Sequence, residues 1–181
     1  ASSTSKRVRT CHPEADARGP ENHLLWKHNR QRLNFEALRD SILAAAGTID
    51  LNMGGPSVDI IDAPFTTRRT IYSFIERQNL PGMFRTFDFA SPDTHSPRRF
   101  RTTVPQQALF MLNGPFVIEQ SRKLAARPEV AQAEGAIERA KALYRIVHNR
   151  EPGAEECALA EKFIADQTTF SDVGSPAWLY G

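Results

Sequence analysis

Proline and glycine divide the second half of the chain into amphipathic segments, and this pattern constrains the fold more than any other feature. Pro105 stands near the first position of one segment, where a residue without an N–H costs a helix nothing. Asn113-Gly114-Pro115 ends that segment and begins another, which runs to about Arg127. Two further segments with helical spacing cover residues 134–148 and 154–167. In the second, Ala160, Phe163 and Ile164 are expected to be buried, as is the small thiol of Cys157. The sequence therefore predicts a mainly helical domain.

The first half contains one further predicted helix, over residues 34–46. Asn34 is a good N-cap residue, because its side chain can accept a backbone N–H. Apolar residues fall on one face of this segment, and Gly47 provides the stop. Those residues are Phe35, Leu38, Ile42 and Ala45. We expect this amphipathic helix to pack against the rest of the domain.

Residues 47–67 are rich in Gly, Pro, Asn and Asp, which predicts a long ordered loop. Residues 69–75 are rich in β-branched and aromatic side chains, so we predict a strand there. Residues 79–82 then turn the chain, and residues 83–89 are predicted to pair back as a second strand. The fold class expected from the sequence is thus α+β, helical with a short two-stranded β element and long ordered loops.

The length of 181 residues suits one compact domain. We expect residues 1–19 to be a polar arm or the remnant of an upstream region, 20–170 the domain, and 171–181 a linker or the start of a following module. The net charge of +2 gives only a weak preference for anionic partners. No apolar run approaches the roughly 20 residues of a transmembrane helix, so we predict no transmembrane segment.

Motifs for cofactors and common nucleophiles are incomplete in this sequence. Cys11-His12 resembles the end of a c-type haem attachment site, but the first cysteine would stand at position 8, which is Val8. The five histidines do not form a His-Glu-x-x-His motif, and two distant cysteines give no zinc-site pattern. Residues 54–57 fit neither a phosphate loop nor a nucleophile elbow, so a structural turn is expected there. We therefore predict no cofactor and no metal in this segment.

A dense set of polar side chains surrounds the predicted strands. Its arginines have planar guanidinium groups suited to carboxylate, phosphate or sulfate, and its Thr, Gln and Asn can bond sugar hydroxyls. The candidate ligand-binding residues are Arg69, Arg77, Asp88, Arg99, Thr103, Gln107 and Asn113. The alternative is that the same residues brace the fold, and only clustering on one concave surface would separate the two.

Several segments together resemble a planctomycete-type domain of unknown function, which lies C-terminal to a cytochrome-c-like domain in large exported proteins. The most distinctive is Thr-Thr-Val-Pro-Gln-Gln-Ala-Leu-Phe-Met-Leu-Asn at residues 102–113. The others are residues 20–26, 32–40, 53–57, 68–72 and 87–89. The resemblance implies an exported bacterial parent, periplasmic or on the cell surface, in which any haem belongs to another region. It implies no catalytic residues.

Three functions remain open from the sequence. The first is a non-catalytic structural or interaction domain, whose loop and strands dock onto neighbouring domains of the same chain. The second is a polysaccharide-binding or polysaccharide-active domain using the polar set, with Asp40 or Asp88 as the acid or base. The third is nucleic-acid binding through basic stretches at residues 6–9 and 98–101, and export of the parent argues against it. Whether the domain is an enzyme is not decided by the sequence.

Overall fold

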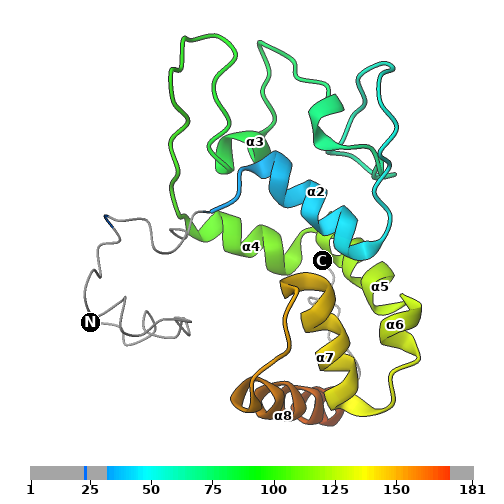
Figure 1. The fold of residues 1–181 in the computed structure, drawn as a ribbon. Coiled ribbons are helices and arrows are strands. Elements are labelled where there is room, and N and C mark those ends of the chain that lie inside the picture. The colour runs from blue at the N-terminus through cyan, green and yellow to red at the C-terminus, as the bar shows by residue number, and fades with distance from the viewer. Residues whose placement is uncertain (1–22, 24–31, 172–181) are drawn as a thin grey trace. The chain divides into compact units, whose positions relative to one another are not determined.

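The computed structural model describes His23 and residues 32–171, and the chain divides into two units, residues 1–32 and 33–181. The second unit is mainly helical, as predicted (Figure 1). Its elements are α2 (Phe35–Ala46), η2 (Thr70–Tyr72), α3 (Gly82–Thr86), α4 (Pro105–Asn113), α5 (Pro115–Ala125), α6 (Pro128–Ala131), α7 (Gly135–His148) and α8 (Ala154–Ser171). Helix α2 packs against η2 and α5, and α5 packs against α4 and α6.

Helix α2 begins and ends where the sequence predicts. It follows Asn34 and stops at Gly47, whose φ of 73° is left-handed and whose N–H bonds to Ala44 O. The Asn34 side chain makes no capping hydrogen bond, so only its backbone role is confirmed. The buried positions along the helix are Phe35, Arg39, Leu43 and Ala46. The core-facing side is therefore rotated by about one residue from the predicted apolar face, and it includes an arginine.

The predicted β element is not a sheet. Residues 69–75 contain the 3₁₀ helix η2, flanked by isolated bridges that join Asp50 to Arg68 and Val58 to Ser73. Residues 83–89 lie mostly in the short helix α3. Phe84 and Phe87 are three positions apart, so the helical turn buries both rings on one side, which alternation along a strand would not do.

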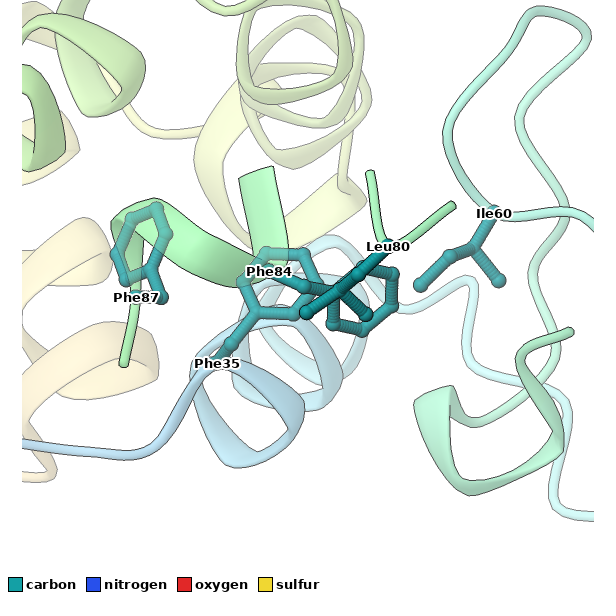
Figure 2. Packing of buried hydrophobic residues seen from close by; sticks show 5 residues of the cluster. All are labelled: Phe35, Ile60, Leu80, Phe84 and Phe87. Carbon is teal, nitrogen blue, oxygen red and sulfur yellow. The ribbon is translucent and has the colours of Figure 1, made fainter. Parts of the chain in front are cut away.

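The core beside α2 consists of Phe35, Ile60, Leu80, Phe84 and Phe87 (Figure 2). The Phe35 ring lies 5.0 Å from the Phe84 ring, edge to face, and 5.3 Å from the Phe87 ring. Edge-to-face pairs at such distances are favourable beyond the area they bury. Aromatic packing thus fixes α3 and the loops on either side of it to the start of α2.

A second cluster joins α2 to α5 through Leu43, Phe116 and Val117. Phe110 on α4 packs against both clusters. Gly114 ends α4 and also caps α5, and a Cβ at this position would lie 2.6 Å from the backbone oxygen of Phe110. The φ of −62° at Gly114 suits any residue, so backbone conformation does not require glycine here. The close approach of the Phe110 backbone does.

The last two helices, α7 and α8, pack against each other, and α7 also contacts α6. Both were predicted, but α8 extends to Ser171, four residues beyond the predicted end. The sequence also predicted a buried Phe163, and this was wrong because its side chain is 64% exposed. Among the described residues, no helix combines the length and apolarity that crossing a bilayer requires.

Candidate functional site

A buried arginine holds the second half of the long loop against α2. Arg39 is 2% exposed, and its guanidinium donates to Thr66 O at 2.6 Å, to Arg68 O at 2.9 Å and to Thr70 Oγ1 at 3.3 Å. Its Cζ also lies 4.9 Å from the centre of the Phe116 ring. Burial lowers the pKa of Arg39, and the neighbouring Asp40 charge partly opposes that shift. Arg39 is therefore a brace between α2, α5 and residues 66–70.

Asp40, the residue after Arg39, accepts hydrogen bonds from residues 69–70. Its Oδ1 accepts from Thr70 N and from Thr70 Oγ1, both at 2.7 Å, and its Oδ2 pairs with Arg69 Nε at 3.2 Å. These bonds hold the start of η2 in its bent conformation. Both carboxylate oxygens are engaged within the chain, so Asp40 supports structure in a position where the sequence had suggested an acid or base.

Arg68 and Tyr72 fix the glycine turn at residues 54–57. Arg68 Nη1 donates to Pro56 O at 2.9 Å, and Nη2 donates to Gly54 O. The guanidinium lies over the Tyr72 ring, 4.1 Å from its centre, and the Tyr72 hydroxyl accepts from Gly54 N at 2.8 Å. Gly54 and Gly55 have φ of 82° and 90°, a conformation that favours glycine. This turn is ordered by specific hydrogen bonds.

The braced region exposes large apolar side chains. We call residues 50–58 together with 68–74 the loop platform. Met53 is 91% exposed and Ile71 is 72% exposed, and Leu51 and Phe74 are also exposed. The polar groups of the platform are bonded within the chain, while its apolar side chains reach solvent. This arrangement is suited to contact with another surface.

Asp88, Arg99 and Gln107, three of the predicted site residues, tie the loop between α3 and α4 to the helices. Asp88 accepts from Thr102 N at 2.8 Å and from Thr102 Oγ1 at 2.7 Å. Buried Gln107 donates to Thr86 O at 2.8 Å. These bonds fix both ends of the loop.

Arg99 turns inward from the same loop. Its Nη1 pairs with Glu36 Oε1 at 2.7 Å, and its Cζ lies 4.5 Å from the centre of the Phe89 ring. The ion pair links the loop to the first turn of α2. These contacts of Arg99 hold the loop against the rest of the domain.

The remaining candidates have separate surroundings. Arg69 is bound to Asp40, and Arg77 forms an exposed ion pair with Asp93 at 3.0 Å. Thr103 and Asn113 are both exposed, before α4 and at its end. The described contacts thus place the seven candidates at several points of the loops and of α4, and five of them bond within the chain.

The candidate ligand-binding residues did not include Arg39, Arg68 or Tyr72, which organise the platform. For Arg39 a signal was present, because it stands four residues from both Phe35 and Leu43. An arginine at that spacing shares the face of its apolar neighbours. Arg68 and Tyr72 carry no such periodic signal.

Metal-ligand side chains do not gather within the described residues: no group of three or more His, Cys, Asp or Glu there could hold an ion. Cys157 is a free thiol of intermediate exposure on α8, whereas the sequence favoured a buried one. Cys11 and His12 lie outside the described residues.

Fold and site together define a mainly helical domain with a braced, apolar loop platform. The chain belongs to the PSD1 family, described as a protein of unknown function (DUF1553), which it matches over residues 1–164. This supports the predicted domain of unknown function. No curated protein and no solved structure matches the chain.

Proposed function

We propose that this chain is a non-catalytic interaction domain of a larger exported protein associated with a cytochrome-c-like domain, and that the loop platform docks onto a neighbouring domain. The observation that carries the proposal is the contrast within the platform. Its polar groups are bonded internally through Arg39, Asp40, Arg68 and Tyr72, whereas Met53 projects into solvent.

A braced loop binds at a lower entropic cost than a loose one. Segments that are already fixed lose little conformational freedom on association, so more of the apolar burial contributes to affinity. Fully burying a side chain such as Met53 or Ile71 contributes about 1.5–3 kcal/mol relative to exposure. The platform therefore has the composition and order of a docking surface.

The export and the cytochrome-c-like neighbour in this proposal rest on the resemblance in residues 20–165. They are tested by the sequence upstream in the gene: a secretory signal and a Cys-x-x-Cys-His motif are expected there. A cytoplasmic location of the protein in a fractionated cell would contradict the export.

The docking itself is tested by site-specific photo-crosslinking in the parent protein, expressed in its own cells. A benzophenone amino acid replaces Met53 or Ile71 in separate variants, with exposed Gln132 on the loop after α6 as the matched control. We expect crosslinks from positions 53 and 71 to one defined polypeptide segment, identified by mass spectrometry. Equal crosslinking from position 132, or none from the platform, would refute docking.

Polysaccharide binding is the second candidate. Its supporting observation is that Arg69 and Arg77 remain 49% and 74% exposed in their side chains despite their ion pairs. Each guanidinium thus keeps donors for a sulfate or uronate group. A panel of sulfated and neutral glycans tests this candidate, with the Arg69→Ala and Arg77→Ala variants as controls. Absence of binding by the unmodified protein would eliminate it.

A further inference from the structure

The loop between α3 and α4 presents a second feature that the platform does not include. We call residues 91–104 the arginine loop. It is held at Asp93, Arg99 and Thr102 by the contacts described above. Because Arg99 turns inward between them, its neighbours Arg98 and Phe100 both lie exposed, and the Phe100 ring is 80% exposed. The protein thus holds an aromatic ring and an arginine in solvent on an anchored backbone.

Charge is concentrated in the same part of the chain. Residues 77–103 contain five arginines and two aspartates, a formal charge of +3, whereas the whole chain carries +2. Both aspartates are engaged: Asp93 pairs with Arg77, and Asp88 accepts from the arginine loop. Arg85 on α3 is exposed as well. Residues 32–171 together have a formal net charge of 0, so this stretch is a local region of excess positive charge within them.

We propose that the arginine loop binds an acidic polypeptide segment, with Arg98 bound to its carboxylates and Phe100 inserted among its apolar side chains. This inference rests on the proposed interaction function and names the chemistry of a partner. Arginine forms paired hydrogen bonds with carboxylates, and the positive field speeds encounter with an acidic surface.

A polypeptide fits this composition better than a nucleic acid or a sulfated glycan. Phosphate and sulfate polymers are bound through many cationic contacts, and their affinity depends on that number. Here a moderate charge accompanies a single highly exposed aromatic ring. Arginine and aromatic residues are the types enriched where protein–protein interfaces concentrate their binding energy.

The test begins with selection of binders from a displayed random-peptide library on the full chain. Selected peptides are then measured by fluorescence anisotropy against two double variants. The loop variant is Arg98→Glu with Phe100→Ala, and the matched control is Lys162→Glu with Phe163→Ala on α8. The control makes the same kinds of change at exposed sites. Circular dichroism melts establish that both variants fold.

We expect acidic peptides containing aromatic or aliphatic residues, whose affinity falls at least ~10-fold in the loop variant and is unchanged in the control. Their affinity should also weaken with added salt, since exposed charges are screened. Acidic peptides that bind the loop variant normally would overturn the assignment of the site.

Other outcomes separate this inference from the proposed function. Neutral apolar peptides that are lost on Met53→Asp would overturn the acidic partner and leave the docking platform supported. Failure to select any peptide, together with absence of crosslinks from position 53, would overturn both. Heparin or single-stranded DNA binding more tightly than every peptide, and only when Arg98 and Phe100 are intact, would assign the loop to a different class of polyanion.

Discussion

Replacement of Arg39 by methionine tests the internal bracing of the loop platform most directly. Methionine keeps the length and the apolar stem of the side chain but removes three hydrogen bonds, to Thr66 O, Arg68 O and Thr70 Oγ1. The Thr70 hydroxyl still donates to Asp40, so losing the hydrogen bond from Arg39 to this hydroxyl costs little stability. The two carbonyl oxygens lose a donor in a partly buried site, and the measured cost should come mainly from them.

The expected magnitude follows from those two acceptors. Each unsatisfied buried acceptor costs about 1–3 kcal/mol. Part of this is offset, because methionine needs no desolvation of a charge, and Arg39 Nε has no hydrogen-bond partner in the described part of the chain. We expect Arg39→Met to lower the free energy of unfolding by about 2–4 kcal/mol.

Urea unfolding followed by circular dichroism measures this free energy, and hydrogen exchange reports the platform. The matched control is Arg69→Met, which removes one half-exposed ion pair to Asp40 and should cost at most about 1 kcal/mol. Faster amide exchange over residues 50–74 should accompany the Arg39 variant. Equal unfolding free energies for the two variants, or unchanged exchange in the platform, would refute the bracing argument.

Two further substitutions probe the helix junction and the glycine turn. Gly114→Ala should lower stability by about 1–3 kcal/mol, because the new methyl group meets the Phe110 backbone oxygen; a Gly82→Ala control, which meets nothing within 4 Å, should stay within about 0.5 kcal/mol in the same urea titration. Equal effects at the two glycines would contradict the close approach. Tyr72→Phe removes the acceptor for Gly54 N–H, so exchange of that amide measured by NMR should accelerate while global stability falls by about 0.5–1.5 kcal/mol. Unaltered exchange at Gly54 would show that the hydroxyl does not hold the turn.

The helical part of the fold follows from local signals. Pro105 and Pro115 stand at the starts of α4 and α5, and Gly47 ends α2, so these boundaries were predicted closely. Such signals act through the backbone of the same few residues. These signals do not depend on tertiary contacts, and this is why a single sequence is enough to predict the helix boundaries.

The errors have a tertiary origin. The composition of residues 69–75 favours a strand, but Asp40 binds the Thr70 backbone and side chain and bends the segment into η2. The aromatic run at residues 83–89 becomes a helical turn because Phe84 and Phe87 both meet the Phe35 ring. In each case a contact with a residue distant in sequence determines the local conformation and overrides the local propensity.

The contacts of the candidate residues could not be predicted from the sequence. The sequence drew attention to the arginines and carboxylates of the loops, but it did not predict their ion pairs, such as that of Arg99 in the arginine loop with Glu36 on α2. Apolar periodicity also fails to predict the burial of Arg39, because it assigns the buried face of α2 from the apolar residues alone. The structure shows where these charges bond, and binding of a ligand by the seven candidates stays a prediction.

The single-residue connection at Gly114 has a consequence for how this domain can vary. Helices α4 and α5 share that residue as the end of one and the start of the other, and Phe110, one turn before it, contacts both hydrophobic clusters of the core. An added residue at this connection between α4 and α5 would rotate α5 relative to α4 and separate the two hydrophobic clusters. Natural variants of the domain should therefore change length in the stretches between α2 and α4, where extra chain can extend into water, and keep this connection at constant length.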